Sequence, residues 1–332
     1  MKYFDAFSGI GGFRQGFQEY GECIGHCDIN KQANITYEAI YGNERTFTDI
    51  TKITDEEWLS LSDVDVFLGG IPCTSFSIAG KRKGFDDERG IGSLFFDYLR
   101  GIKLANPSFV FIENVKGLVS HDKGRTIDTM VKELNSLGYK VDFEVLNATD
   151  YGIPQKRDRV FIVGVKEDLY KEPLFPLLKK ESPKYIEDIL EDLPFSSIER
   201  LEREPKLLTE LEISQYTKPF LTNNKQEVHC INSKKSNGKQ PSQQDRIYDN
   251  LGILPTISAS LGGRYLIFDK NHKLLRKITP KEAWRSQGFS DIDYEKAELV
   301  TSVGQLYKQA GNAIPAPLSV ALANAWKETY SN

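Results

Sequence analysis

The stretch Val64-Asp65-Val66-Phe67-Leu68-Gly69-Gly70-Ile71-Pro72-Cys73 decides the fold that we expect for this chain. The β-branched and aromatic residues of its first half are typical of a buried strand. Two glycines and a proline then place Cys73 at a turn, where the carboxyl end of the strand meets a loop. Open α/β sheets bind their ligands at this position. The alternative is a structural cysteine, because unpaired cysteine is among the most buried residue types.

The residues after Cys73 favour a reactive thiol. They are small and polar, and the basic run Lys81-Arg82-Lys83 follows within ten positions. Positive charge close to a thiol favours the thiolate, which is the nucleophilic form.

Size and composition are those of an ordinary globular protein. The chain has 332 residues, of which 39% are hydrophobic and 27% charged, enough for two domains or for one large α/β domain with an insertion. No apolar run approaches the ~18 residues that span a bilayer, and the N-terminus leads directly into a strand without a signal peptide. We therefore expect a cytoplasmic protein without a membrane segment.

Cysteine usage and charge narrow the class further. The four cysteines form no disulfide framework, and we expect Cys23 and Cys27 to be core residues and no metal to be bound. The formal net charge of −4 argues weakly against nucleic-acid binding. Basic residues nevertheless cluster at 81–83, 156–159, 234–239 and 264–277. These clusters are either local phosphate-binding surfaces or ordinary solvated faces.

Strands and helices alternate from the N-terminus onward. A strand at 2–7, the turn Ser8-Gly9-Ile10-Gly11-Gly12 and a helix at 13–20 form the usual entry to a nucleotide or nucleoside site. A second strand ends in Asp28, about twenty positions past the turn, where a carboxylate often binds ribose hydroxyls. Capping of the helix at 31–41 is the alternative role for Asp28. Asp49 ends a third strand, and the absence of a P-loop lysine favours an adenosine-bearing cofactor without phosphates.

Charged residues mark the later strands of this domain. The apolar strand 109–115 contains Glu113 near its end, and such a carboxylate is costly unless it is paired or protonated. If the carboxyl group of Glu113 is protonated, it is suited to donate a proton in catalysis. After a helix at 125–137 and a strand at 139–146, Arg157 and Arg159 lie on one side of the entry to a buried strand at 160–165. Two arginines there indicate ligands for an anion or a base, with a surface ion pair as the alternative.

The alternation stops near residue 179. Residues 182–250 are polar and rich in loop signals, so we expect a second, smaller domain whose composition suits contacts with DNA bases and backbone, or any loop-rich domain. Regular structure resumes where Thr279, Pro280 and Glu282 form a capping box. A terminal helix is predicted at 316–330.

Taken together and in this order, the motifs resemble those of the cytosine-5 DNA methyltransferases of bacterial restriction-modification systems. The resemblance covers nearly the whole chain except about residues 182–242. The matching motifs are Asp5–Gly12, Pro72-Cys73 with Phe76-Ser77, Glu113-Asn114-Val115, Gln155–Arg159, Thr279–Phe289 and Gly311–Pro315.

The resemblance implies an α/β fold with a Rossmann-like sheet that binds S-adenosylmethionine, and a second, smaller target-recognition domain. The implied domains are 1–184 for catalysis and cofactor binding, 185–274 for target recognition and 275–332 for the return to the catalytic domain. The implied activity is that of a DNA (cytosine-5-)-methyltransferase. Duplex DNA is the implied partner, together with a restriction endonuclease for the same site, and we expect a monomer without a metal.

Site residues follow from the resemblance by position. The implied catalytic residues are Cys73, Glu113, Arg157 and Arg159. The implied cofactor residues are Phe7, Ser8, Gly9, Ile10, Gly11, Asp28, Ile29, Asp49, Ile50, Gly70, Pro72, Leu94, Phe289, Asn312 and Ala313. The implied DNA contacts are Thr74, Ser77, Lys81, Arg89, Gln243 and Thr256.

Two positions depart from the family pattern, and three rival functions stay open. Many members have an aromatic residue where Ile29 stands, and glutamine is usual at the position of Thr74. The rivals are a related transfer-RNA cytosine methyltransferase, a catalytically silent DNA-binding regulator and a nicotinamide dehydrogenase. The last is suggested by the glycine turn alone and leaves Cys73 and the arginine pair unexplained.

Overall fold

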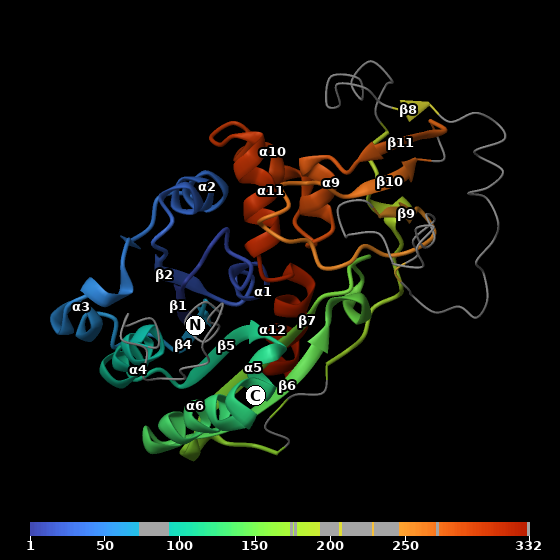
Figure 1. The fold of residues 1–332 in the computed structure, drawn as a ribbon. Coiled ribbons are helices and arrows are strands. Elements are labelled where there is room, and N and C mark those ends of the chain that lie inside the picture. The colour runs from blue at the N-terminus through green and yellow to red at the C-terminus, as the bar shows by residue number, and fades with distance from the viewer. Residues whose placement is uncertain are drawn as a thin grey trace. The chain divides into compact units, whose positions relative to one another are not determined.

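A computed structural model of the chain describes residues 1–72, 93–172, 175, 178–192, 206–207, 228, 246–269 and 272–330 (Figure 1). The chain divides into two compact units. The first unit comprises Met1–Asn147, Asp158–Lys180 and Ala313–Asn332, and the second comprises Ala148–Arg157 and Glu181–Asn312. Residues 275–312 lie in the second unit, and the domain bounds expected from the sequence stay predictions.

A seven-stranded sheet in the order β3-β2-β1-β4-β5-β7-β6 forms the centre of the first unit. β7 pairs antiparallel with both β5 and β6, whereas the other pairs are parallel. The predicted α/β class is confirmed, but the reversed strand was not predicted. The strands are β1 (Lys2–Ala6), β2 (Glu22–Cys27), β3 (Thr46–Phe47), β4 (Val66–Gly70), β5 (Phe109–Val115), β6 (Tyr139–Asn147) and β7 (Asp158–Lys166).

Helices cover both faces of this sheet. On one face the rings of Phe4 and Phe67 stack at 5.1 Å, and Trp58 of α3 packs edge-on against Phe4. On the other face Phe17 of α1 meets Phe111 at 5.1 Å, and Trp326 of α12 packs nearby. The helices of this unit are α1 (Arg14–Phe17), α2 (Lys31–Tyr41), α3 (Asp55–Leu59), α4 (Ser93–Ala105), α5 (Gly117–Ser120), α6 (Arg125–Ser136) and α12 (Ala316–Tyr330), with 3₁₀ turns η1 (Ile50–Lys52), η3 (His121–Gly124) and η5 (Glu167–Leu169).

Alternation along the strands explains this two-sided core. Phe4 and Ala6 of β1 belong to the first face, while Tyr3, which precedes Phe4, points to the face that carries Phe17. Each large apolar side chain that is fully buried contributes about 2–3 kcal/mol relative to an exposed position. The sheet is therefore stabilised from both faces, as a mostly parallel sheet requires.

Local capping sets the helix starts. Asn30 caps α2, and its side chain accepts hydrogen bonds from the backbone N–H groups of Gln32 and Ala33. The alternative in which Asp28 caps this helix is therefore wrong. The capping box that begins at Thr279 is present, as predicted, and a second capping box begins at Thr54.

The second unit contains a small sheet in the order β8-β11-β10-β9. Its strands are β8 (Lys206–Leu207), β9 (Ile247–Asp249), β10 (Leu266–Asp269) and β11 (Leu274–Lys277). Its helices are α9 (Pro280–Arg285), α10 (Asp291–Glu298) and α11 (Val303–Asn312), with 3₁₀ turns η4 (Ala148–Tyr151) and η6 (Ile186–Ile189).

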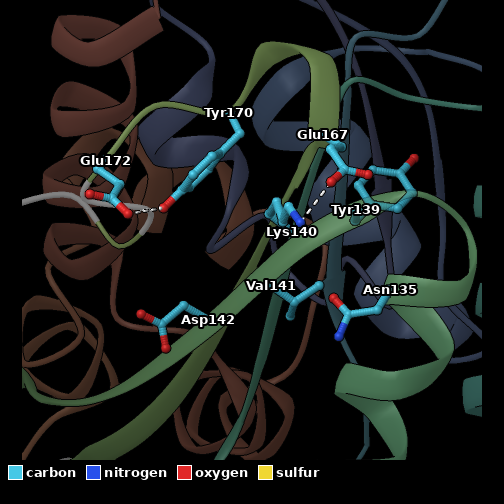
Figure 2. A pocket seen from close by; sticks show the side chains of 8 residues that line it. All are labelled: Asn135, Tyr139, Lys140, Val141, Asp142, Glu167, Tyr170 and Glu172. Atoms are coloured by element: carbon cyan, nitrogen blue, oxygen red, sulfur yellow. Dashed lines mark hydrogen bonds and ion pairs between the residues drawn. The ribbon is translucent and has the colours of Figure 1, made fainter.

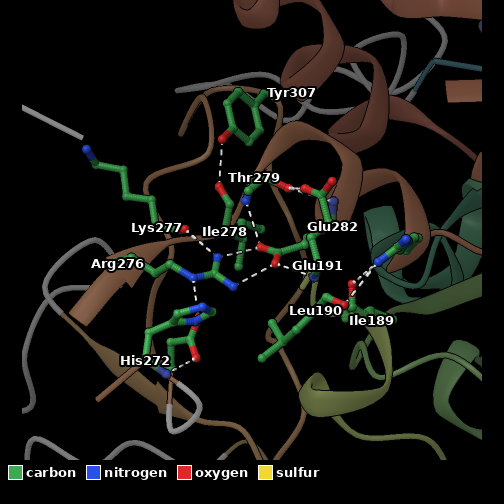
Figure 3. Close-up of polar contacts among 12 residues, drawn as sticks. Ile189, Leu190, Glu191, His272, Arg276, Lys277, Ile278, Thr279, Glu282 and Tyr307 are labelled. Carbon is green, nitrogen blue, oxygen red and sulfur yellow. Dashed lines mark hydrogen bonds and ion pairs between the residues drawn. The ribbon is translucent and has the colours of Figure 1, made fainter. Parts of the chain in front are cut away.

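A buried ionic cluster joins β10 and β11 to helix α9 (Figure 3). Two nitrogens of Arg276 donate to the two carboxylate oxygens of Glu282 at 2.7 and 2.8 Å, and its Nε donates to Asp269 at 2.7 Å. Glu282 also accepts the backbone N–H of Thr279 in the capping box. Since buried charges are tolerated only when they are paired and hydrogen-bonded, this cluster fixes the hairpin to the helix.

Other expectations concern cysteines, metals and membranes. Cys23 and Cys27 are buried free thiols, as predicted. Within the described ranges, no group of three or more His, Cys, Asp or Glu residues could hold a metal ion. None of the helices seen there is long and apolar enough to cross a membrane.

We predict that Gly69→Ala destabilises the first unit by about 1–3 kcal/mol, because overpacking a filled core has this cost. A Cβ at position 69 would lie 2.6 Å from the ring of Tyr98, which is itself fully buried and cannot move aside. Chemical denaturation measures the change in the free energy of unfolding. Gly117→Ala is the matched control, since its Cβ would meet only Val115 at 3.9 Å; equal losses in both variants would contradict the packing argument.

Candidate active site at the carboxyl edge of the sheet

The turn after β1 has a backbone that few residues adopt. Phe7, Gly9 and Gly11 have φ angles of +53°, +54° and +83°. The N–H of Ser8 donates to the carbonyl of Cys27 at the end of β2, and the N–H of Gly11 donates to the carbonyl of Ser8. A left-handed phenylalanine is strained by about 1–2 kcal/mol, and such strain is typical of functional sites.

Asp28 faces this turn from the end of β2. Its carboxylate accepts the N–H of Gly9 at 2.8 Å and the N–H of Asn30 at 2.7 Å. Burial raises the pKa of Asp28, and the two backbone hydrogen bonds oppose that rise. Ile29, directly after it, has a side chain that is 80% exposed. Both residues therefore lie beside the glycine turn, where the sequence predicted a cofactor site.

The third predicted acidic position differs in character. The carboxylate of Asp49 caps the short turn η1 and accepts from both the N–H and the hydroxyl of Thr51. The hydrogen bond from the hydroxyl of Thr51 is the main cause of the lowered pKa of Asp49. Ile50 is buried in the core beside Phe47 rather than exposed. The roles of both residues in cofactor binding stay predictions.

Glu113 forms an ion pair with Arg159. The Nε of Arg159 lies 2.8 Å from Oε1 of Glu113, and both side chains are nearly buried. Glu113 pairs in register with Gly70 of β4, while Val115 pairs with Arg159 at the beginning of the antiparallel β7. A buried carboxylate must be either paired or protonated, and in this structure Glu113 is paired with Arg159.

Asn114 lies beside Glu113 at the site, and the sequence alone assigns it no role. Its side chain is buried, and Nδ2 donates to the carbonyl of Ile71 at 3.0 Å. This bond ties the end of β5 to the segment that leads through Pro72 to Cys73. The position of Asn114 directly after Glu113 in the motif Glu113-Asn114-Val115 is the signal that the sequence offers.

Arg157 has different partners from Arg159. It lies in the second unit and is 2% exposed, and its two terminal nitrogens donate to the carbonyls of Ile257 and Gly311 at 3.1 and 3.0 Å. Gln155 beside it accepts the N–H of Ile257. The guanidinium of Arg157 therefore holds backbone segments of the second unit in place.

The remaining predicted residues are distributed as follows. Leu94 is partly buried against the core of the first unit, and Phe289 is buried against Trp284 in the second. Asn312 is exposed and Ala313 is buried. The hydroxyl of Thr256 donates to the carbonyl of Lys156. Cys73, Thr74, Ser77, Lys81, Arg89 and Gln243 lie outside the described residues.

A polar pocket at the other end of the strands is separate from this site (Figure 2). Tyr139 begins β6 and Glu167 follows β7, so the pocket lies at the edge opposite to Glu113 and Arg159. Its lining includes no predicted site residue and consists of Asn135, Tyr139, Lys140, Val141, Asp142, Glu167, Tyr170 and Glu172. An internal ion pair joins Lys140 to Glu167.

Comparison with known proteins decides the family. The sequence profile of the C-5 cytosine-specific DNA methylase family matches residues 1–328. The chain belongs to this family. It is a DNA cytosine methyltransferase, and the predicted resemblance and activity are confirmed.

Relatives from bacteria agree with this assignment. The type II methyltransferase M.HhaI of Haemophilus parahaemolyticus is 36% identical over 95% of this chain and 90% of its own length. The type II methyltransferase M.Bsp6I of Bacillus sp. (strain RFL6) is 34% identical over 94% of each chain.

Solved structures agree on the fold. A putative DNA modification methyltransferase encoded within a prophage of E. coli is 19% identical, with a TM-score of 0.70 over the whole of both chains. The Dnmt2 methyltransferase of S. pombe is also 19% identical, with a TM-score of 0.69 over 99% of each chain. The expected S-adenosylmethionine methyltransferase fold is thus confirmed.

We predict that Arg159→Met costs about 3 kcal/mol in the free energy of unfolding, because it removes the charge that compensates a nearly buried carboxylate. The double variant Glu113→Gln, Arg159→Met should lose less than the sum of the two single variants, since the pair is coupled. Urea denaturation of the four proteins closes the cycle. Additive losses would contradict an ion pair at this position, and Lys116→Met, which breaks an exposed contact with Asp158, is the control.

Proposed function

We propose that this methyltransferase modifies cytosine in a specific duplex DNA site through a covalent adduct at Cys73. The observation that carries the proposal is the Glu113–Arg159 pair beside the end of β4. From that end the chain continues through Ile71, whose carbonyl is held by Asn114, towards Cys73. A carboxylate and a guanidinium therefore lie at the edge of the sheet from which the chain continues to Cys73, and their position supports the proposed role of Cys73 as the nucleophile.

The residues of the glycine turn fit S-adenosylmethionine as the methyl donor. No described atom lies within 4 Å of a Cβ placed on Gly9, so its backbone is open to a ligand. The carboxylate of Asp28 suits ribose hydroxyls, and the exposed side chain of Ile29 offers an apolar surface for adenine. When bound, the donor supplies a methyl group on a sulfonium. We assign no metal to the site.

The chemistry requires activation of the pyrimidine, because carbon 5 of cytosine is a poor nucleophile. The thiolate of Cys73 adds to carbon 6, and electron density moves to carbon 5. Glu113 takes up a proton as the base binds, donates it to the ring nitrogen and accepts a hydrogen bond from the exocyclic amine, which offsets the electron density that builds on the ring. Arg159 holds Glu113 and the base carbonyl, while Arg157 holds the adjacent backbone. After methyl transfer, carbon 5 loses its proton and the thiolate is expelled.

Access to the base requires flipping. An enzyme cannot reach carbon 6 inside a duplex, and extruding a base costs a few kcal/mol. We assign Thr74, Ser77, Lys81 and Arg89 to DNA contacts around the extruded base, and Gln243 with Thr256 to target recognition.

The biological setting is inferred from the relatives. Those described above are named type II methyltransferases, which supports a role in a restriction-modification system. A restriction endonuclease for the same site, a monomeric state and a cytoplasmic location belong to this proposal.

We predict that Cys73→Ser abolishes methylation of duplex DNA while the dissociation constant for S-adenosylmethionine stays within about threefold of the parent. Transfer of a labelled methyl group and calorimetry measure the two quantities. Cys23→Ala is the control, because burial raises the pKa of that thiol far above neutrality and keeps it unreactive. Retained turnover in Cys73→Ser would exclude Cys73 as the nucleophile.

We also predict that duplex DNA containing 5-fluorocytosine at the target becomes covalently attached to the enzyme. Fluorine cannot leave carbon 5 as a proton does, so the adduct with Cys73 persists and migrates as a stable complex in denaturing gels. When the same enzyme preparation is given transfer RNA and S-adenosylmethionine with a labelled methyl group, the transfer RNA should receive no labelled methyl. Labelling of transfer RNA in place of DNA would favour the rival substrate class.

A further inference from the structure

Ser8 is anchored at three points within the turn that follows β1. Its N–H donates to Cys27, its carbonyl accepts from Gly11, and its hydroxyl lies 3.1 Å from Nδ1 of His26. The residues on either side, Phe7 and Gly9, both have left-handed backbones. The side-chain contact is therefore the one anchor of Ser8 that does not depend on backbone pairing.

His26 is fully buried on β2 and contacts polar groups at both ring nitrogens. Nδ1 faces Ser8, and Nε2 lies 3.0 Å from the hydroxyl of Thr46 on β3. The ring stacks on Tyr37 of α2 with a centroid separation of 3.9 Å. Burial lowers the pKa of His26 to about 4, so the ring is neutral near pH 7 and carries a single proton.

The surroundings of Thr46 decide which nitrogen carries that proton. The hydroxyl of Thr46 has one hydrogen, and it lies 3.3 Å from both the carboxylate of Glu38 and the carbonyl of Glu44. If Nε2 is protonated, it donates to Thr46, whose own hydrogen then serves those acceptors. If Nδ1 were protonated, the hydrogen of Thr46 would have to serve Nε2 and both acceptors would lose it. The first arrangement makes more hydrogen bonds.

We infer that His26 is a positioning residue for the cofactor turn, holding it as the Nε2–H tautomer that accepts the hydroxyl hydrogen of Ser8 at Nδ1. The bond keeps the strained Phe7–Gly9 backbone in the form that offers the N–H of Gly9 to Asp28. It also leaves the oxygen of Ser8 with only lone pairs available, so this hydroxyl acts as an acceptor. The inference rests on the proposed cofactor site at this turn.

Nitrogen-15 NMR of the histidine-labelled parent protein tests the tautomer directly. The chain has four histidines, and the loss of a signal in His26→Gln assigns the ring. We expect an unprotonated Nδ1 and a protonated Nε2 at pH 7; a protonated Nδ1 would overturn the inference. The tautomer is read in the parent protein, and the variant serves only to assign the signal.

A pair of variants tests the positioning role. The amide of Asn places an acceptor near the position of Nδ1, whereas that of Gln reaches the position of Nε2. We expect His26→Gln to raise the dissociation constant for S-adenosylhomocysteine about fivefold to tenfold, the usual effect of losing one buried hydrogen bond. His26→Asn should stay within about threefold. Calorimetry measures the constant, and thermal unfolding should show similar losses in both variants.

Two further comparisons complete the design. Ser8→Ala should weaken binding at least as much as His26→Gln, because it removes the bond to His26 and the acceptor oxygen together, and the double variant should weaken binding no further than Ser8→Ala alone. Equal dissociation constants for the Gln and Asn variants would overturn the inference. Asp28→Ala separates this failure from that of the proposed cofactor site: if Asp28→Ala also binds normally, the site itself is wrong.

Discussion

The ion pair between Arg159 and Glu113 depends on the direction of a single strand. In a fully parallel sheet the beginning of β7 would lie at the amino edge, far from the end of β5. Because β7 runs antiparallel to β5, the residue opposite Val115 is Arg159, and its guanidinium reaches Glu113 at 2.8 Å. The carboxyl edge therefore carries a cation as well as the carboxylates of Glu113 and Asp28. The ion pair offsets the desolvation cost of placing the nearly buried carboxylate of Glu113 here.

Much of this site could be predicted from sequence because its causes are local. Glycines at 9 and 11 are needed where the backbone is left-handed, and the end of β2 places Asp28 beside them. The apolar strand at 109–115 was found with its bounds unchanged. The capping box at Thr279 was found in the same way, since Pro280 and Glu282 are adjacent signals. Turns and helix caps are determined by residues a few positions apart, so they can be recognised in a single sequence.

The unpredicted features depend on contacts between distant residues. Arg14 pairs with Glu44 thirty positions away while its guanidinium lies over the ring of Tyr41. His26 gave no signal as a single histidine within an apolar strand, because its partners Ser8 and Thr46 come from separate segments. Asp28 was open to two roles, and only the position of Asn30 excluded the capping role. No local pattern encodes which side chains meet across a sheet.

The two arginines of the Gln155–Arg159 segment show why spacing alone does not define a role. Both were expected to face one side and to act as ligands, yet Arg157 donates to two backbone carbonyls while Arg159 meets a carboxylate. Each arrangement uses the planar fork of guanidinium, which presents several donors in fixed directions. A lysine offers one charged nitrogen and could not join the carbonyls of Ile257 and Gly311 with the same geometry. The same residue type thus provides backbone organisation at one position and charge compensation at the other, and the acceptors that fold around each one decide between them.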